Sequence, residues 1–267
     1  MITIMYFSPV GGTKKIVMTL MKELVQTHEV KEICINSPLA RKPVYEFTEK
    51  DVLIVASPTY AGRIPNKIMP FFRDNIIGNG ALCIPVVTYG NRSYDSSLLE
   101  MAHLMERNGF HLLGAGAFVT KHAMSETLAK DRPNEEDLEE IRSFARAIVK
   151  KLNHMTEDSF INLEGEVGPY YIPKKENGEK AVFLKAKPIV DHDICIKCGK
   201  CADCCPMGSI SKEMDYETMS ICIKCHACIQ VCPADARSFH DSDLASHIRM
   251  LEENYCGVKR QNTVLMN

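Results

Sequence analysis

The feature that most restricts this chain is the crowding of its cysteines. It has 12 cysteines in 267 residues, and nine of them lie between Cys195 and Cys232. They form two copies of one pattern, C-x2-C-x2-C-x3-C-P, which begin 27 residues apart at Cys195 and Cys222. A disulfide scaffold would spread its cysteines through a short secreted domain. Crowding into one segment instead indicates metal or cluster binding in a reducing compartment.

The spacing within each copy predicts two [4Fe–4S] clusters. Three closely spaced thiolates wrap one cubane, and the chain then turns so that the cysteine before proline reaches the other cluster. Two structural zinc ions are the alternative, because zinc also takes four ligands, but zinc sites commonly pair two C-x2-C units. The first cluster is expected to take Cys195, Cys198, Cys201 and Cys232, and the second Cys222, Cys225, Cys228 and Cys205.

Four cysteines stand outside these two sets. Cys204 adjoins a ligand and could compete for iron by a slip of one residue, but the proline that follows the next cysteine favours that neighbour. Cys34 and Cys83 lie in apolar strand patterns and are expected to be small core residues. We expect Cys256 to be a free thiol, and His226, which lies between two ligands, to be solvated and not a ligand.

The first 155 residues alternate apolar runs with amphipathic stretches, which is typical of a parallel sheet with crossover helices. Helical periodicity predicts helices at 14–26, 93–108 and 133–153. The last has acids at its start and basic residues near its end, as the helix dipole favours. Together these units predict a complete doubly wound domain with five strands, at Ile2–Phe7, Val30–Asn36, Asp51–Ala56, Leu82–Thr88 and Leu112–Thr120.

Three loops of this domain are candidates for binding FMN. The first is a glycine-rich turn between the first strand and the first helix, where backbone N–H groups can hold an anion. The others follow the third and fourth strands, at the sheet edge where ligands bind, and each offers an aromatic ring and a glycine. The expected residues are Ser8, Val10, Gly11, Gly12, Thr13 and Lys14, then Pro58, Thr59, Tyr60, Ala61 and Gly62, then Tyr89, Gly90, Asn91, Arg92, Tyr94 and Asp95.

Two arginines, Arg63 and Arg92, occur in these loops. A cation near the flavin ring would favour its anionic reduced form, because opposite charges attract strongly at low dielectric. We therefore expect a flavin environment less acidic than that of simple flavodoxins, unless both arginines point into solvent or bind phosphate.

The rest of the chain changes character after residue 155. Residues 156–190 lack a sustained period and are expected to form a long, partly ordered linker. Its lysines could fold over the cysteine-rich part or guide a partner. Residues 191–240 carry the two motifs, and 241–267 are expected to form a helix at 241–255 and a tail.

No apolar stretch approaches the ~20 residues that span a bilayer. The N-terminus is strand-like and not a signal peptide, so we expect a cytoplasmic protein.

The motifs support a resemblance to known families. Residues 1–155 resemble a flavodoxin domain, whose phosphate loop (S/T)-x-(S/T)-G-x-(S/T) is matched by Ser8, Gly11 and Thr13, while Val10 departs from it and removes one hydroxyl. Residues 191–240 resemble a bacterial two-[4Fe–4S] ferredoxin. The order of the two is similar to that of the flavodoxin–ferredoxin fusion proteins of anaerobic bacteria and archaea.

The resemblance implies a flavodoxin-like α/β domain with a five-stranded parallel sheet in the order 2-1-3-4-5, and a small α+β ferredoxin domain. It implies FMN and two [4Fe–4S] clusters as cofactors of an electron-transfer protein or oxidoreductase. The alternatives are a pure electron carrier without a substrate of its own and a redox sensor with labile clusters. The expected partner is a redox protein or a small-molecule electron acceptor. The net charge of −2 gives no reason to expect nucleic acid. A homo-oligomer is left open.

Overall fold

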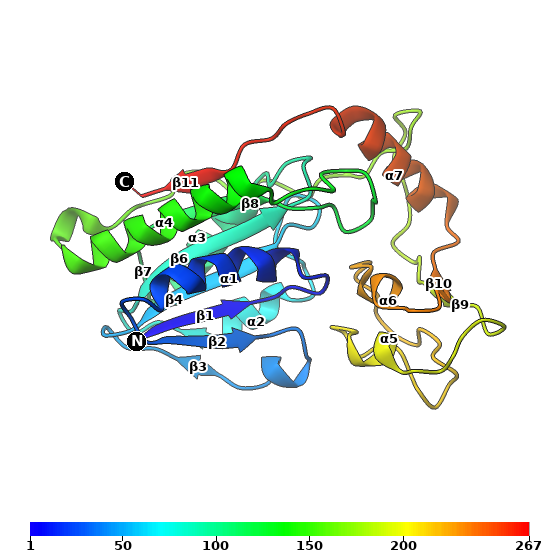
Figure 1. The fold of residues 1–267 in the computed structure, drawn as a ribbon, viewed down its shortest axis with the longest axis horizontal. Coiled ribbons are helices and arrows are strands. Elements are labelled where there is room, and N and C mark those ends of the chain that lie inside the picture. Colours follow the sequence, from blue (N-terminus) through cyan, green and yellow to red (C-terminus); the bar gives the residue numbers. More distant parts are fainter. Residues whose placement is uncertain (267) are drawn as a thin grey trace.

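A mostly parallel sheet forms the centre of the larger part of the molecule. The computed structural model describes residues 1–266 (Figure 1). Five parallel strands run in the order β2 (Val30–Cys34), β1 (Ile2–Tyr6), β4 (Val52–Pro58), β6 (Leu82–Tyr89) and β8 (Ala115–Val119). Strands β2, β1 and β4 begin at the same height in the sheet, because Ile2 pairs with both Val30 and Val52. This is the expected doubly wound order 2-1-3-4-5, so the flavodoxin-like fold is confirmed.

Helices cover both faces of this sheet. On one face, α1 (Gly12–Leu24) and α4 (Glu135–Asn153) share a core with side chains of β1, β4 and β6. On the other face, α2 (Met69–Asp74) and α3 (Ser97–Arg107) share a second core with the alternate side chains of the same strands. The strands are therefore buried on both sides, which explains why they read as unbroken apolar runs.

Several short elements have no counterpart among the predicted ones. They are too short for hydrophobic periodicity to reveal them. They are α2, the paired strands β3 (Tyr45–Glu46) and β5 (Ile76–Ile77), and the 3-10 turns η1 (Leu39–Arg41) and η2 (Glu157–Ser159).

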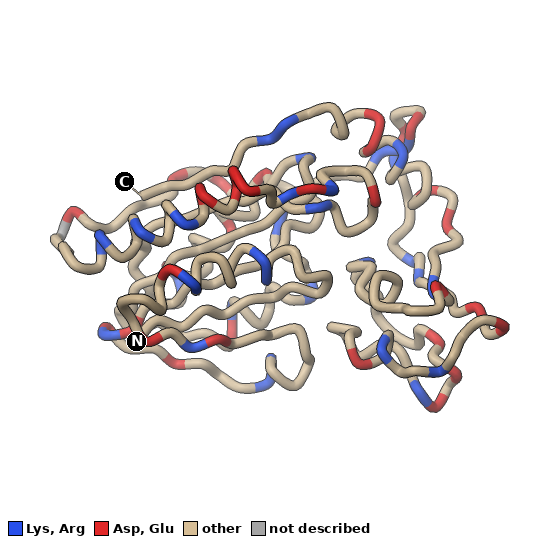
Figure 2. Tube along the Cα trace, in the orientation of Figure 1, with Lys and Arg blue, Asp and Glu red and all other residues tan. Residues whose placement is uncertain are grey.

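Helix α4 carries the charge gradient that the sequence predicts. Glu135, Glu136 and Asp137 lie in its first turn and Lys150 and Lys151 in its last (Figure 2). A reciprocal capping box at the first turn satisfies backbone N–H groups that lack helical partners. Among residues 1–266, neither α4 nor any other helix combines the length and apolar character needed to cross a membrane.

The predicted fifth strand is interrupted in the structure. A short strand, β7 (His111–Leu112), pairs with β6 before the chain continues as β8. Between them lies Gly114, where a Cβ atom would come within 2.7 Å of the Met266 sulfur. The break therefore lies where Leu265 and Met266 approach the strand closely.

The C-terminal segment is more than a helix and a tail. After α7 (Ser242–Tyr255), the chain returns to the sheet and adds β11 (Thr263–Leu265) antiparallel to β8 (Figure 1). The prediction of a purely parallel, five-stranded sheet is thus corrected to seven strands, one of them antiparallel. Strand β11 covers the exposed edge of β8, an edge that would otherwise present unpaired backbone groups.

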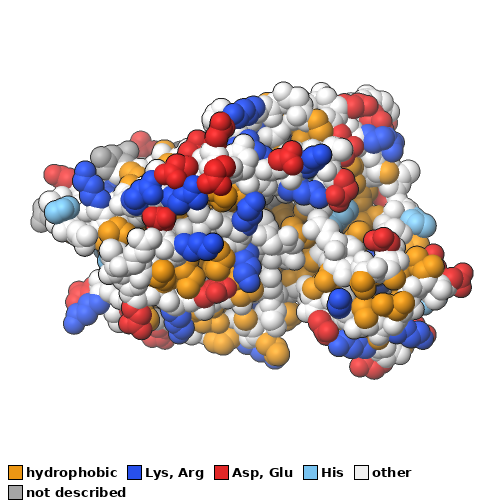
Figure 3. Space-filling view, in the orientation of Figure 1, with side chains coloured by type: hydrophobic (Ala, Val, Ile, Leu, Met, Phe, Trp, Pro, Cys, Tyr) orange, Lys and Arg blue, Asp and Glu red, His pale blue; other side chains and the backbone are white. Residues whose placement is uncertain are grey.

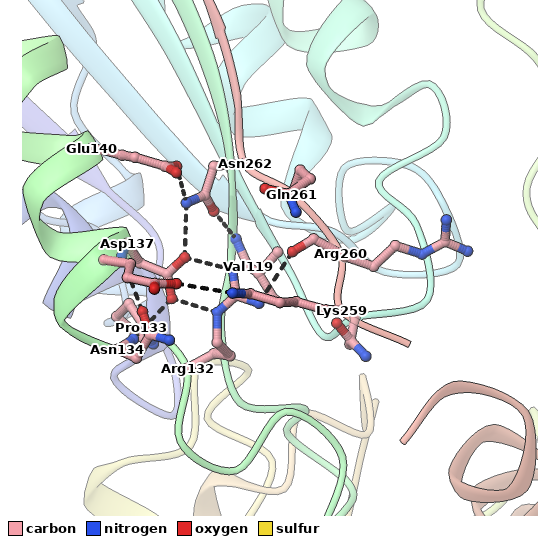
Figure 4. Close-up of polar contacts among 12 residues, drawn as sticks. Val119, Arg132, Pro133, Asn134, Asp137, Glu140, Lys259, Arg260, Gln261 and Asn262 are labelled. Carbon is pink, nitrogen blue, oxygen red and sulfur yellow. Dashed lines mark hydrogen bonds and ion pairs between the residues drawn. The ribbon is translucent and has the colours of Figure 1, made fainter. Parts of the chain in front are cut away.

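The Asn262 side chain hydrogen-bonds this returning segment to the start of α4 (Figure 4). Its side-chain oxygen accepts the Val119 N–H at 2.9 Å, and its amide nitrogen donates to Asp137 at 2.8 Å. Arg132 donates two hydrogen bonds to the same Asp137 carboxylate, and it also donates to the Arg260 carbonyl at 3.1 Å. Asp137 is only 4% exposed in this pair, so its charge depends on these donors.

We expect Asp137→Ala to destabilise the protein strongly. The substitution leaves the Arg132 guanidinium without its carboxylate, and breaking a buried pair in this way costs about 3 kcal/mol. That cost corresponds to roughly 6–12 °C in the unfolding midpoint of a domain of 150–250 residues. Differential scanning calorimetry measures it. The matched control is Glu136→Ala, which removes an exposed pair with Lys259 and should leave the midpoint nearly unchanged. Equal midpoints for the two variants would contradict the role of Asp137.

The Asp137 carboxylate also makes the stability of the fold depend on pH in acid solution. Burial opposes its ionisation, but hydrogen bonds from Arg132, the Asn134 backbone and Asn262 outweigh burial and hold the pKa of Asp137 below its usual value. Its contribution to stability is therefore complete above the ordinary aspartate pKa of about 3.9 and is lost as the pH falls through the lowered folded-state pKa.

Candidate functional site

The cysteine-rich part of the chain consists of two similar halves. Each contains a short helix, α5 (Lys200–Asp203) or α6 (Ala227–Gln230), and one antiparallel ladder joins the ends of the module through β9 (Ile189–Val190) and β10 (Arg237–Ser238). The backbone turns match as well. Lys197 and Lys224 have φ of 54° and 55°, and the helix N-caps Gly199 and His226 have φ of 77° and 62°. The sequence repeat is therefore also a structural repeat.

Each half of the repeat contributes cysteines to two small cavities. The first cavity is lined by the set predicted for one cluster, and the second by the set predicted for the other. Among residues 1–266, no three His, Cys, Asp or Glu side chains converge closely enough to hold a single metal ion. The sets are Cys195, Cys198, Cys201 and Cys232, and Cys205, Cys222, Cys225 and Cys228.

Backbone N–H groups point at several of these sulfurs. Ser209 donates to Cys205 Sγ at 3.3 Å, and the equivalent Ala236 donates to Cys232 Sγ at 3.2 Å. Such bonds favour the thiolate form that metal binding requires. Burial acts in the opposite sense and raises the pKa of the Cys228 thiol to about 11. A buried thiol of this kind ionises when a metal or cluster compensates its charge.

Arg237 supplies an independent indication that a negative group belongs here. It is 3% exposed, and its guanidinium donates to the Tyr216 carbonyl, to Thr218 Oγ1 and to the Pro188 carbonyl. Its buried Nε has no hydrogen-bond partner. Arg237 lines the first cavity, and its charge favours the thiolate of Cys228 in the second. A buried cation with an unpaired N–H fits an anionic iron–sulfur cluster with four thiolates.

His226 lies differently from the prediction of a solvated side chain. Its ring stacks on Phe239 with centroids 4.9 Å apart, and its Nε2 is buried without a hydrogen-bond partner. Burial lowers the pKa of His226 to about 4. It lines the second cavity together with the cysteines. No short-range pattern indicates this burial, because the covering Phe239 lies 13 residues further on.

Cys204 lines neither of the two cysteine-lined cavities. Its S–H donates to the Cys201 carbonyl at 3.4 Å, and burial raises the pKa of its thiol to about 12. In the second half of the repeat its place is taken by Val231. The core position expected for Cys83 agrees with the structure, whereas Cys34 is exposed, because β2 is an edge strand whose outer residues lack a cover.

A third and much larger cavity, of about 980 Å³, lies between the sheet and the cysteine-rich module. The arrowheads of β1 and β4 point toward it in Figure 1, and Figure 3 shows a hollow between the two parts. It therefore occupies the carboxyl edge of the sheet, where ligands bind in this fold. Most of the residues predicted for FMN line it: Ser8, Val10, Gly12, Thr13, Pro58, Thr59, Tyr60, Ala61, Gly62, Tyr89, Gly90 and Arg92.

The glycine-rich turn at this cavity is held in place before any ligand arrives. Asn36 accepts the Ser8 N–H at 2.6 Å and donates to the Ser8 carbonyl at 2.9 Å. The Ser8 hydroxyl accepts the Lys14 N–H at 2.9 Å, and Gly11 takes φ of 87°, which glycine adopts without strain. The first N–H groups of α1 lack helical partners and carry the positive end of its dipole. This turn fits a phosphate.

Five predicted residues do not reach the cavity wall. Asn91 instead donates to the Tyr255 and Val258 carbonyls, both at 2.8 Å, and Tyr94 donates to Thr263 at 3.2 Å. Both side chains hold the returning C-terminal segment, which the sequence could not place beside them. The five are Gly11, Lys14, Asn91, Tyr94 and Asp95.

The two loop arginines have different environments. Arg63 is absent from the cavity wall, because it donates to Glu100 at 2.6 and 2.9 Å and lies over the Tyr170 ring. Arg92 does line the cavity, paired with Asp95 and 4.0 Å from the centre of the Tyr171 ring. Of the two arginines, only Arg92 lines the cavity, and Glu100 balances the charge of Arg63.

Much of the cavity wall comes from segments that sequence reasoning missed. Residues 156–190 are hydrogen-bonded along the sheet domain, for example from the Tyr171 N–H to the Ala61 carbonyl at 2.8 Å. The only signal in the sequence was the presence of aromatic residues in a stretch without periodicity. The missed wall residues include Thr120, Lys121, His122, Ala123 and Met124 after β8, Tyr170, Tyr171 and Phe183 in the linker, and His247 and Leu251 of α7.

The large cavity and the second cysteine-lined cavity share a wall. Ile221, Cys222 and Ile223 line both of them, whereas none of the residues 1–266 lines both the large cavity and the first cysteine-lined cavity. Tyr60 lies at this wall: burial raises its pKa, and the neighbouring Cys225 and Cys222 raise it further. The geometry thus places one cysteine set next to the large cavity and the other beyond it.

Known proteins are similar to the two parts of the chain separately. Residues 187–233 match the family described as 4Fe-4S dicluster domain. A search of curated proteins finds no match. An archaeal flavodoxin is 18% identical (58% of this chain and 100% of that chain; TM-score 0.44). Flavodoxin 2 of Bacillus cereus is 22% identical (56% and 98%; TM-score 0.41). The strand order, and not these distant similarities, establishes the fold. The chain joins a flavodoxin-like domain to a ferredoxin-type 4Fe-4S domain.

Proposed function

We propose that this protein is an electron-transfer iron–sulfur flavoprotein that passes single electrons between two [4Fe–4S] clusters and FMN within one chain. The observation that carries the proposal is the wall of Ile221, Cys222 and Ile223 shared by the large cavity and the second cysteine-lined cavity. A shared wall keeps two redox groups close without any collision between molecules.

Each cysteine set holds one cluster in this proposal. Cys195, Cys198, Cys201 and Cys232 bind the first, and Cys205, Cys222, Cys225 and Cys228 bind the second. Arg237 balances part of their negative charge from its buried position. When bound, the clusters supply one-electron chemistry and FMN supplies one- or two-electron chemistry, while the protein sets position and potential.

The strand-end loops hold FMN. The turn from Ser8 to Thr13 binds the phosphate through backbone N–H groups, and the Thr13 hydroxyl, 2.8 Å from that of Thr88, is buried beside it. Val10 offers no hydroxyl there, so the backbone contributes more of the phosphate binding. Tyr60 and Gly62 border the ring on the side of the second cysteine set.

The protein wall beside the strand-end loops favours an oxidoreductase with its own substrate over a pure carrier. A carrier leaves the flavin edge bare so that partner proteins can approach it. Here the linker residues Tyr170, Tyr171 and Phe183 and the α7 residue His247 complete the wall. The outer cluster, held by the first cysteine set, is then the point where an external electron donor or acceptor docks. Ile194 and Ile196, 49% and 64% exposed, lie beside it.

We expect anaerobically purified protein to contain about eight iron and eight sulfide per chain, the content of two cubanes, together with one FMN. Iron and sulfide are measured by colorimetric assay, zinc by mass spectrometry, and flavin by extraction and chromatography. Stoichiometric zinc in place of iron would refute the clusters, and reconstituted protein that retains no FMN after desalting would refute the flavin site.

A further inference from the structure

The wall of the large cavity has an unusual charge. Acidic residues slightly outnumber basic ones in the chain, 34 to 32, yet within the described residues no Asp or Glu lines this cavity. Its basic wall residues are Lys67, Arg92, Lys121, Lys185, Lys187 and Lys224, with the histidines His122 and His247. Two of these cations are balanced by carboxylates outside the wall, Arg92 by Asp95 and Lys121 by Glu126. Among the described residues, Lys67, Lys185, Lys187 and Lys224 have no ion-pair partner, and a cleft with an excess of one sign of charge concentrates ligands of the opposite sign.

The phosphate of FMN does not account for these cations. It belongs at the turn from Ser8 to Thr13, and none of the basic wall residues comes from that turn. They come from the loops after β4, β6 and β8, from the linker and from the cysteine-rich module. The volume of about 980 Å³ also lies at the upper end of the range of roughly 300–1,000 Å³ for ligand pockets.

Aromatic rings gather on the linker side of the cavity. Phe183 stacks on His247 with centroids 5.5 Å apart and planes inclined by 30°, and Tyr171 lies 6.3 Å from the same His247. Arg92 lies over the Tyr171 ring. Flat groups arranged in this way present apolar faces to a planar ligand.

His122 adds a hydrogen-bond donor to this side. Its Nδ1 accepts the Met124 N–H at 3.2 Å, so the proton of the neutral ring is on Nε2. Burial, with smaller effects from His226, His247 and Arg92, lowers the pKa of His122 to about 4, and the ring is neutral near pH 7. The ring packs against Gly90 of the flavin loop, where a Cβ atom would come within 2.3 Å of its Cδ2.

We propose that the linker side of the cavity, formed by His122, Tyr171, Phe183, Lys185 and His247, binds a small planar organic anion of the aromatic carboxylate class beside the flavin. The stacked rings take the planar body of the ligand, His122 donates to its carboxylate, and Lys185 attracts it at the exposed rim. The inference rests on the proposed function, because FMN fills the strand-end loops.

Three probes test the proposal on the full-length, FMN-loaded protein at constant ionic strength. Benzoate is planar and charged, benzamide is planar and neutral, and cyclohexanecarboxylate is charged and not planar. We expect benzoate to bind with a Kd of about 0.1–10 mM, as suits so small a ligand, and to perturb the flavin absorption spectrum. The other two should bind at least about fivefold more weakly, since each lacks one recognised feature. Equal binding of all three, or no benzoate binding by calorimetry or absorption, overturns the proposal.

Single substitutions test which residue recognises the planar body of the ligand and which recognises its charge. Phe183→Leu should remove the preference for benzoate over cyclohexanecarboxylate, and Lys185→Gln should weaken benzoate without affecting benzamide. The matched control is Lys130→Gln, an exposed lysine outside the cavity wall, which should change neither. Benzoate affinity that is unchanged in both cavity variants overturns the assignment. Flavin content is measured on every sample. Protein without FMN refutes the proposed function and this inference together, whereas full FMN without benzoate binding refutes only the inference.

Discussion

Replacing Cys205 by serine should remove about half of the bound iron, the share of one of two cubanes, whereas replacing Cys204 by serine should remove none. Cys205 lines the second cavity, and its sulfur accepts the Ser209 N–H at 3.3 Å, as the equivalent Cys232 accepts that of Ala236. Cys204 faces the Cys201 carbonyl and lines neither cysteine cavity. Iron and sulfide per chain, measured on protein purified without oxygen, report the difference.

The two variants control for each other, because they make the same chemical change at adjacent positions. The Cys205→Ser protein should keep its FMN, since the phosphate turn and the loops after β4 and β6 do not depend on that sulfur. Equal iron loss in both variants would contradict the assignment of the ligands. Loss confined to Cys204→Ser would mean that the motif is shifted by one residue.

Reduction of the flavin through the clusters should proceed at a rate that does not depend on protein concentration. The wall shared by the large cavity and the second cysteine set keeps donor and acceptor in one chain, so their effective concentration is fixed by the fold. Stopped-flow mixing with a fixed excess of a low-potential donor, followed at flavin wavelengths over a series of protein concentrations, measures the rate.

The Cys205→Ser variant extends this experiment. Without the second cluster, the flavin should be reduced only as fast as the external donor reaches it directly. Its control is Cys204→Ser, which should keep the rate of the parent protein. A rate that rises in proportion to protein concentration would show transfer between molecules. The mass of the protein in solution is needed as well, because a dimer with exchanged domains would also give a constant rate.

The linker shows why composition alone is a weak guide to such a site. Its lysines suggested a segment that folds over the cysteine-rich part, and Lys187 does donate to the Met219 carbonyl at 3.3 Å. Lys224 in turn donates to the Leu184 carbonyl at 2.6 Å. The aromatic residues Tyr170, Tyr171 and Phe183, however, determine that the linker completes the cavity. No period marks them, because they contact surfaces that are distant in the sequence.

The sequence by itself determined the features that short-range patterns encode. Apolar runs such as Val52–Pro58 predict strands buried on both faces, and the spacing of two, two and three residues between cysteines separates each motif into three neighbours and one more distant member. Both patterns act over a few residues, so the backbone geometry of a strand or a turn is enough to translate them into structure.

Only the tertiary structure decided which surfaces meet. Strand β11 is three residues long and has no pattern of its own, and it forms because β8 offers an unpaired edge and Asn262 joins that edge to Asp137. The return of this strand turns Asn91 away from the cavity to hold the C-terminal segment. Likewise, the second cysteine set lies next to the large cavity because the strand-end loops, the linker, the cysteine-rich module and α7 together form the wall of that cavity. Contacts of this kind depend on the sum of many distant packing and hydrogen-bond energies, which no local pattern records.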